Sequence, residues 1–347
     1  MASDDRWLER LRLELAWFTG QPLLRERGAG AILRFERVRP RRGGGFQPLR
    51  ESEITPQFLD RAIRALKRWR FDFLGMDDVC RRAVTLPDQG RFVALTFDGA
   101  SKDVIRFAYP VLTRHAVPFT VYVPTAFPDG VGEAWRIGLE QVIARESRIS
   151  LMMGDKEQRF VVTGNAEKRA LFSLVESWLR SLPPADLSAA INDLCARYRI
   201  DLTALSREAS MDWEDLAKLA ADPLVTIGSA TVNYPALANM KDAAAQREMT
   251  MGRAVAEAAF RRETRHFAFP FGDRNSFRRS HVVMAEEAGF ASAVSTIPGV
   301  VEAEGRTNLR ALPRIAWDGR MQSLRMLRVL VSGVAFSPVK PTPSATN

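Results

Sequence analysis

The chain has 347 residues, 46% of them hydrophobic, and a formal net charge of +9. This length and composition exclude a mainly disordered protein and fit one large α/β domain or two smaller ones. Its two cysteines, Cys80 and Cys195, lack C-x-x-C spacing, which argues against a disulfide framework or a cysteine zinc site and predicts free, buried thiols.

The first segment, residues 1–29, is expected to contain a charged amphipathic helix that ends near Phe18. It has no basic stretch followed by an apolar run and a small-residue cleavage site, so a secretory signal is not indicated. No apolar run approaches the roughly 18 residues that span a bilayer, because Arg325 and Arg328 interrupt residues 321–334. We therefore expect a cytoplasmic protein without a transmembrane segment, and a disordered tail over 335–347.

Arginine is concentrated between Arg25 and Arg50. Such a surface favours an anionic ligand, for which acidic polysaccharide, anionic lipid and nucleic acid all qualify. A solvated basic surface in an arginine-rich proteome is the alternative, and it is the interpretation we favour. No aromatic-interleaved basic motif accompanies the charge, so specific nucleic-acid binding is not expected. Only Glu26 and Glu36 oppose the arginines of this region, which are Arg25, Arg27, Arg34, Arg37, Arg39, Arg41, Arg42 and Arg50.

From Gly30 onward, strand and helix patterns alternate. Thr55 is predicted to cap a helix that begins at Pro56, because threonine before proline is a typical helix start. The apolar run that ends at Asp98 predicts a buried strand. Strands are predicted over 30–38, 71–74, 92–98 and 119–123, and helices over 56–69, 76–83 and 104–115.

Between Glu133 and about Ala209 the pattern becomes mostly helical, with helices over 166–182 and 184–198. We interpret 133–209 as an insertion packed on the main domain. The alternation then resumes with Ser210 as the predicted N-cap of a helix, followed by strands over 224–228, 265–269 and 291–295 and helices over 243–260 and 280–288. Repeated strand–helix units favour a (β/α) barrel or a doubly wound sheet, which the pattern alone does not separate.

The strand that ends in Thr96-Phe97-Asp98-Gly99 resembles the T-F-D-D-G signature of the polysaccharide deacetylases, the family of the NodB homology domain. The segment 225–235 is similar to the family's G-S-H-T-x-x-H-P motif. The resemblance extends over about 30–331 and implies an irregular seven-stranded (β/α) barrel over 30–334. Further similar segments are Ala108–Thr120 (Y-P-V-L-x-x-H-G-x-P-x-T in the family), Phe267–Asp273 (F-A-Y-P-Y-G-D), Ala288–Val294 (A-G-F-x-x-A-V) and Leu312–Ile315 (L-P-R).

In the family, the first Asp of the signature is the general base, and the second Asp and two histidines hold a divalent metal. The corresponding ligand positions of this chain are Gly99, Ala230 and Tyr234, and Glu36 stands where many relatives have His. The resemblance thus implies that no metal cofactor is held and that N-deacetylase activity is lost or strongly reduced. The three histidines, His115, His266 and His281, form no H-x-x-x-H pair and are predicted to be structural.

Asp98 is expected at the carboxyl end of a barrel strand, where catalytic residues belong. It could be a general base, or a structural carboxylate that is hydrogen-bonded to loop amides or paired with an arginine. The cleft around Asp98 is expected to comprise Glu36, Gly99, Lys102, Asp103, Ala230, Tyr234, Pro270, Phe271, Gly272, Asp273 and Arg314.

Two functions remain open at this point. The chain could be a pseudoenzyme that binds a glycan or a protein partner, with Asp98 as the remnant of the metal site. Alternatively, it could be an active hydrolase on the N-acetyl carbon–nitrogen bond of a sugar, with a rearranged site around Asp98, Asp273 and Glu36. A nucleic-acid or anionic-membrane binder that uses the arginines of 25–50 is the weaker third reading.

Overall fold

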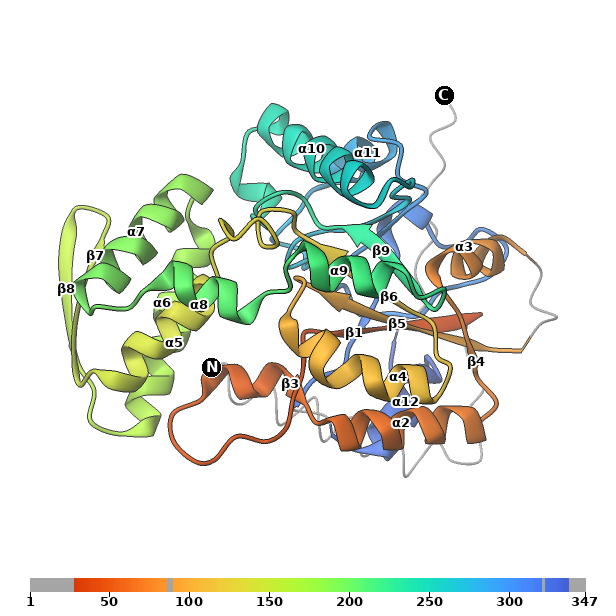
Figure 1. The fold of residues 1–347 in the computed structure, drawn as a ribbon, viewed down its shortest axis with the longest axis horizontal. Helices are drawn as coiled ribbons and strands as arrows, with labels where there is room; N and C mark the ends of the chain where they lie inside the picture. Colours follow the sequence, from red (N-terminus) through yellow and green to blue (C-terminus); the bar gives the residue numbers. More distant parts are fainter. Residues whose placement is uncertain (1–27, 86–89, 320–321, 337–347) are drawn as a thin grey trace.

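The structure is a computed structural model that describes residues 28–85, 90–319 and 322–336. The predicted N-terminal helix and the tail beyond Phe336 lie outside the described residues. Two parts are visible in Figure 1: a curled sheet wrapped by helices, and a smaller helical lobe to one side of it. No helix of the described ranges is long and apolar enough to cross a membrane. Both cysteines are free thiols, with Cys195 buried and Cys80 half-buried.

The centre of the larger part is a parallel sheet whose strands follow the order β11-β10-β9-β6-β5-β1-β12, with β4 beside β5. Parallel strands need helical connections, which matches the alternation in the sequence. Two shorter strands, β2 (Arg37–Val38) and β3 (Glu53–Ile54), pair separately. The sheet strands are β1 (Gly30–Phe35), β4 (Asp72–Phe73), β5 (Phe92–Asp98), β6 (Phe119–Val123), β9 (Val225–Ser229), β10 (His266–Ala268), β11 (Ser292–Val294) and β12 (Ile315–Ala316).

The segment around β12 closes the sheet into a barrel. Ile315 is in register with Leu33 of β1, while Leu312 donates its N–H to the Ala293 carbonyl and accepts from the Ser295 N–H, both at 2.9 Å. The segment 312–316 thus joins β1 to β11, the strand at the other edge of the sheet. The predicted irregular seven-stranded (β/α) barrel is confirmed.

Strand β5 lies in the middle of this barrel, and all seven of its residues are buried. A strand covered on both faces needs a continuous apolar run, which is the pattern that predicted it. Its neighbour β1 approaches closely because residue 30 is glycine: a Cβ at Gly30 would lie 2.4 Å from the ring of Phe92. This contact fixes the two strands whose carboxyl ends carry Arg34 and Asp98.

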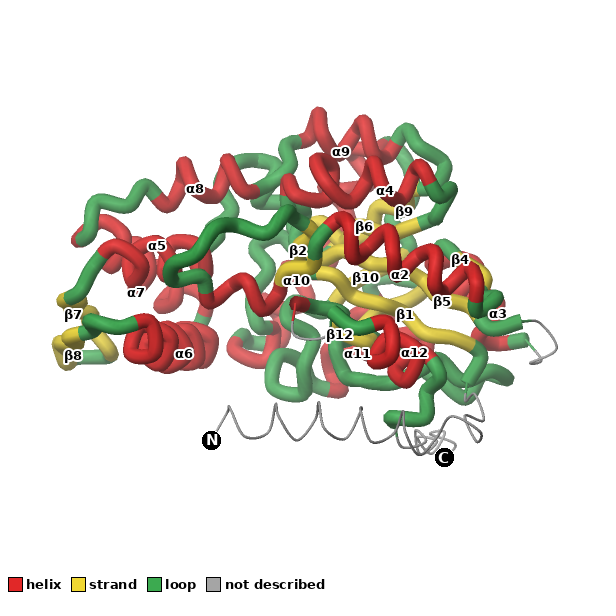
Figure 2. Tube along the Cα trace, turned by 90° about the horizontal axis from the view of Figure 1, so that it is seen from below, coloured by secondary structure: helices red, strands yellow, loops and turns green. Residues whose placement is uncertain are grey.

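Helices cover the outside of the barrel (Figure 2). The predicted start of α2 (Pro56–Arg68) is confirmed, because the Thr55 hydroxyl accepts from the Phe58 N–H at 3.1 Å and Pro56 is the first helical residue. The other helices of the barrel are α3 (Met76–Val84), a π-helical turn (Val104–Ala108) that continues into α4 (Tyr109–Arg114), α9 (Trp213–Ala220), α10 (Asp242–Phe260), α11 (Arg279–Glu287) and α12 (Leu324–Val331).

The lobe corresponds to the region expected as an insertion, and it has an apolar cluster of its own that includes Leu139, Phe172 and Ile191. Leu49 of the short 3-10 helix Pro48–Ser52 joins this cluster and links the lobe to the barrel side. The lobe consists of α5 (Trp135–Arg145), the antiparallel hairpin β7 (Arg148–Met153) and β8 (Lys156–Val161), α6 (Asn165–Ser181), α7 (Pro184–Arg197) and α8 (Leu202–Ala209).

The prediction that Ser210 caps a helix is wrong. An unpredicted helix, α8, runs to Ala209, so Ser210 follows its end. The N-cap of α9 is Asp212, whose carboxylate accepts from the Asp215 N–H at 2.8 Å. Both residue types are good N-caps, and the preceding helix decides between them.

Candidate functional site

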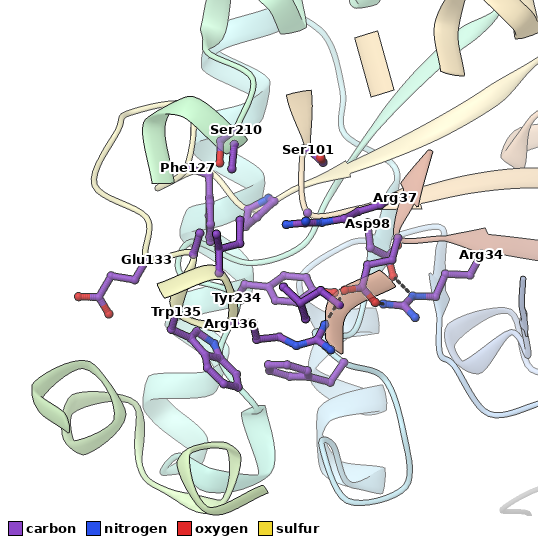
Figure 3. Close-up of a pocket in the computed structure, with 18 residues that line it drawn as sticks. Arg34, Arg37, Asp98, Ser101, Phe127, Glu133, Trp135, Arg136, Ser210 and Tyr234 are labelled. Atoms are coloured by element: carbon purple, nitrogen blue, oxygen red, sulfur yellow. Dashed lines mark hydrogen bonds and ion pairs between the residues drawn. The ribbon is translucent and has the colours of Figure 1, made fainter. Parts of the chain in front are cut away.

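A cleft lies at the carboxyl ends of β1, β5 and β9, where it faces α5 and α6 of the lobe. Its inner end is a pocket of about 140 Å³ between Asp98, Tyr234 and Trp135 (Figure 3). Two adjoining pockets of about 340 and 510 Å³ share Arg34, Glu36 and Arg136 with it. The cleft is therefore long enough for an extended ligand whose end enters the inner pocket.

The Asp98 carboxylate is buried at the end of β5 and accepts hydrogen bonds from two arginines. Arg314 donates from Nη1 to Oδ1 at 2.7 Å and from Nη2 to Oδ2 at 2.8 Å, a bidentate arrangement. Arg34, which ends β1 next to β5, donates from Nε to Oδ2 at 2.7 Å. Both carboxylate oxygens are thus engaged by guanidinium groups.

Arg314 is fully buried, and its guanidinium is bound on several sides. Besides Asp98, it donates to the Ser295 carbonyl at 2.7 Å and to the Thr96 hydroxyl at 3.1 Å. Its guanidinium carbon lies 5.6 Å from the centre of the Tyr122 ring. A buried guanidinium is stabilising only while all of these partners are present, because loss of one partner leaves an uncompensated buried charge.

This arrangement keeps Asp98 ionised. Burial by itself would raise the pKa of Asp98, but the charges and hydrogen bonds of Arg314 and Arg34 outweigh it and hold the pKa below the ordinary value of 3.8. Burial likewise opposes the charge on Arg34, but Asp98, Glu36 and the Tyr234 side chain raise its pKa. Asp98 is thus a weakly basic carboxylate in a buried ion pair.

A second set of ion pairs connects the barrel to the lobe. Arg136 of α5 donates to Glu36 at 2.5 Å and to Glu176 of α6 at 2.6 Å. Burial would raise the pKa of Glu36, but Arg136, Arg34 and Arg37 lower it. Glu36, predicted from the sequence as a cleft residue, therefore lines the cleft as an ionised group paired across it.

Asp273 lies further out in the cleft. It accepts a hydrogen bond from Arg180 of α6, which also donates to Ser276 at 2.9 Å. The Arg180 guanidinium sits over the Phe271 ring, 4.6 Å from its centre, and Phe271 in turn packs against Tyr234 at a centroid distance of 5.4 Å. Asp273 thus pairs with the lobe, and the partners of Asp98 are the two arginines.

The donor set at the three implied metal-ligand positions does not fit a metal. Gly99 has no side chain, and Ala230 is fully buried in the barrel interior among apolar residues. Burial, and then the charge of Asp98, raise the pKa of the Tyr234 phenol to about 12, so it stays protonated. Within the described residues, no group of three or more His, Cys, Asp or Glu side chains is placed to hold a metal ion.

Four other predicted cleft residues lie outside the pockets described above. Lys102 pairs with Asp215 of α9 at 3.5 Å, and Asp103 pairs with Arg39 at 3.5 Å, so the charges of both are engaged by partners other than Asp98. Pro270 and Gly272 shape the loop after β10, where the Gly272 N–H donates to the Pro270 carbonyl at 2.6 Å. They support Phe271 without lining the pocket themselves.

All three histidines lie away from the cleft and have structural contacts. His115 follows α4 and contacts Asp60 at 2.7 Å, His266 contacts the Ser292 hydroxyl at 2.9 Å, and His281 accepts from the Arg278 N–H at 3.0 Å. Both His266 and His281 are almost completely buried. These contacts agree with the structural role predicted for them.

Four of the nine described non-glycine residues with positive φ lie in the loops around the pocket. The left-handed region is unfavourable for residues with a side chain, and such strain collects at functional sites. Here it is adopted after β5 by Ala100 (φ +53°), after β9 by Thr231 (φ +70°) and Tyr234 (φ +59°), and after β10 by Phe271 (φ +59°). The neighbouring Gly99 has φ +91° and open space where its Cβ would be.

Sequence reasoning missed the residues that define the rest of the cleft, which are Arg34, Arg37, Trp135, Arg136, Glu176 and Arg180. A signal existed for Arg34, because an arginine inside a strand of apolar residues needs a buried partner. No local signal distinguished Arg136 or Arg180, since both lie on amphipathic helices that carry many exposed charges. Their role depends on how the lobe is placed against the barrel.

The family model for polysaccharide deacetylase matches residues 160–291. The match covers less than half of the chain, and it shows that this part is similar to the polysaccharide deacetylase family. The match contains Ala230, Tyr234 and Phe271, whereas Asp98 and Arg314 lie on either side of it. No curated protein matches the sequence.

Several solved structures share the fold, among them two deacetylases. The deacetylase PplD of Streptococcus pyogenes, in complex with acetate, has 15% identity and a TM-score of 0.55, with 86% of this chain and 97% of that chain covered. IcaB from Ammonifex degensii has 14% identity and a TM-score of 0.54, with 88% and 99% covered. A de-N-acetylase from Aggregatibacter actinomycetemcomitans has 12% identity and a TM-score of 0.54, with 87% and 99% covered. At these identities the likeness concerns the fold.

Proposed function

We propose that this protein binds a carbohydrate chain in the cleft and has lost, wholly or nearly, the deacetylase reaction of its relatives. The proposal rests on the polysaccharide deacetylase fold together with an altered site. A shared fold supports a carbohydrate ligand only by analogy, so the site has to carry the argument.

The observation that carries the proposal is the state of Asp98. A general base needs an oxygen that can reach the substrate and a pKa near the working pH. Both oxygens of Asp98 accept from Arg314 or Arg34, and its pKa is lowered by the charges of these arginines. The positions that would hold a metal beside it are Gly99, Ala230 and Tyr234, which supply no ionised ligand. This combination argues against base catalysis and against metal-assisted attack by water.

The alternative of acid/base hydrolysis by a carboxylate pair has less support. Such a pair needs one carboxyl group with a raised pKa to act as the acid. Arginines lower the pKa of both Asp98 and Glu36, and Asp273 is bound to Arg180. None of these three carboxylates has the environment of a proton donor.

The lining of the cleft supports a glycan as the ligand. Trp135, Tyr234 and Phe271 present aromatic rings, which pack on the apolar faces of sugar rings, and the surrounding arginines and serines can hydrogen-bond to hydroxyl groups. A concave site with aromatic walls and a few polar groups favours a small or extended ligand over a flat protein surface.

Two measurements on the purified protein test the proposal. Acetate release from N-acetylated oligosaccharides, with and without added divalent metal ions, should stay at the blank level. Titration calorimetry with an oligosaccharide panel should detect binding that Trp135→Ala weakens about fivefold, since an aromatic contact contributes about 1 kcal/mol. Metal-stimulated release of acetate that Asp98→Asn abolishes would refute the loss of activity.

Trp178→Ala is the matched control. Trp178 lies on α6 and, like Trp135, is half-buried against the apolar cluster of the lobe, but it is not among the residues that line the pocket. Equal loss of binding in both variants would indicate damage to the lobe and would count against a sugar contact at Trp135.

A further inference from the structure

Among the arginines that line the inner pocket, Arg37 differs from the others. Arg34 is bound to Asp98 at 2.7 Å, and Arg136 to Glu36 at 2.5 Å. Arg37, at the start of β2, has Glu53 Oε1 as its nearest carboxylate in an ion pair, at 3.9 Å. The same oxygen lies 2.7 Å from Arg42, which donates a hydrogen bond to it. Arg37 therefore shares a glutamate that is already engaged.

The Arg37 side chain is largely withdrawn from solvent, with 14% of its surface exposed, and it lines the pocket next to Asp98 and Ser101 (Figure 3). Burial lowers the pKa of Arg37, and the nearby charges of Glu36, Asp103 and Glu53 offset this only in part. A desolvated cation without a close counter-charge is costly, and an incoming anion would reduce that cost.

Besides Asp98 and Glu36, the acid that lines this pocket is Glu133, and it does not serve as a counter-charge for Arg37. Glu133 accepts from Ser188 at 2.8 Å and from Asn192 at 2.6 Å, and its side chain points away from the pocket (Figure 3). The hydroxyl groups of Ser101 and Ser210 line the same space, and Trp135 forms an aromatic wall. The inner pocket thus combines one underpaired guanidinium, two hydroxyls and an aromatic ring.

We propose that the inner pocket binds an anionic substituent of the carbohydrate, a carboxylate or a phosphate carried by a sugar, with Arg37 as its counter-ion. This inference rests on the proposed binding of carbohydrate in the cleft and adds the class of sugar. It also narrows the prediction of an anionic ligand for the arginine-rich segment. Among the described arginines of that segment, only Arg34 and Arg37 line the inner pocket, and Arg34 is bound to Asp98, so the anion is assigned to Arg37.

The test compares three oligosaccharides of equal length by calorimetry: one that ends in a uronic acid, one that ends in a sugar phosphate, and a neutral one. One acidic ligand should bind about tenfold or more tightly than the neutral one, because charge-assisted hydrogen bonds to arginine are strong. Arg37→Gln should weaken binding of the acidic ligand far more than binding of the neutral one and so remove this preference, while Arg37→Lys should retain part of it. Whichever of the two acidic oligosaccharides binds more tightly identifies the anion as a carboxylate or a phosphate.

Arg39→Gln serves as the matched control. Arg39 contacts the same Glu53 and also Asp103, but it is not among the lining residues of the pocket, so its loss should leave the preference intact. The ligand-free Arg37→Gln variant should unfold at a temperature no lower than that of the native chain, since an underpaired buried cation is removed. A purely structural Arg37 would lower that temperature and spare the preference.

The outcomes separate the two proposals. Equal binding of neutral and acidic ligands, or a preference that persists in Arg37→Gln, overturns the anion site and leaves carbohydrate binding standing. No binding of any of the three ligands overturns both. A preference lost equally in Arg37→Gln and Arg39→Gln would assign it to the general basic surface and would also overturn the site.

Discussion

The barrel and the helical lobe both supply arginines to the same cleft, but they hold them differently. On the barrel side, Arg314 is fully buried and donates to four acceptor atoms, two of them on Asp98. On the lobe side, Arg180 is about one-third exposed and its partner Asp273 is similarly exposed. The barrel side therefore has a fixed internal network, while the lobe side has charges that can exchange partners with water or a ligand.

The largest effect that would test this contrast is expected from Arg314→Ala. Removing the bidentate partner leaves the buried Asp98 carboxylate with Arg34 alone, and breaking a buried pair in this way costs about 3–5 kcal/mol. Denaturant unfolding should show this loss. Arg310→Ala, a half-buried arginine of the same segment that pairs with Glu286 at 3.4 Å, should cost about 1 kcal/mol or less. Equal losses of unfolding free energy in the two variants would contradict the distinction between the fixed ion pairs of the buried network and ion pairs that exchange with water.

Acid unfolding gives a second test on the barrel side. Because the pKa of Asp98 is lowered below 3.8 in the folded chain, its ion pair stabilises the fold above that pH, and this stabilisation is lost as the pH falls through the lowered value. Asp98→Asn should be less stable than the native chain at neutral pH, and its free energy of unfolding should change less on acidification. Parallel pH curves for the two proteins would show that Asp98 is not held by its arginines.

The smallest effect is expected on the lobe side. Arg180→Ala should change the free energy of unfolding by about 1 kcal/mol at most, because a half-exposed ion pair is screened by solvent. The main consequence should be a weaker affinity for a bound glycan, since Arg180 and Phe271 form one wall of the cleft. Differential scanning calorimetry and ligand titration of the same variant separate these effects. A large loss of stability in Arg180→Ala would show that Arg180, like Arg314, belongs to the fixed internal network.

Sequence reasoning succeeded where the determining interactions are local. The apolar run that ends at Asp98 predicted β5, and Thr55 before Pro56 predicted the start of α2, since these patterns specify a buried strand and a helix cap directly. The family motifs then separated a barrel from an open sheet. The cap at Ser210 was predicted wrongly because α8 occupies the residues before it, and short helices without strong apolar periodicity leave little local signal.

The site was predictable only in part, for a geometric reason. Lys102 and Asp103 are close to Asp98 in sequence, but the chain turns after Gly99 and directs them to Asp215 and Arg39. Arg34 and Arg314 are far from Asp98 in sequence and reach it because β1 and β12 are adjacent in the barrel. Which charges meet therefore depends on strand order, which no local pattern contains.

The closing segment of the barrel has a consequence for how the chain is made. Because β12 pairs with β1 and follows every other strand of the sheet in sequence, the ring cannot close until β12 has left the ribosome. Arg314 immediately precedes β12, so the bidentate pair with Asp98 cannot form during synthesis before this last strand emerges. Contacts so distant in sequence form slowly, and the nascent chain exposes an incomplete sheet until β12 has been synthesised.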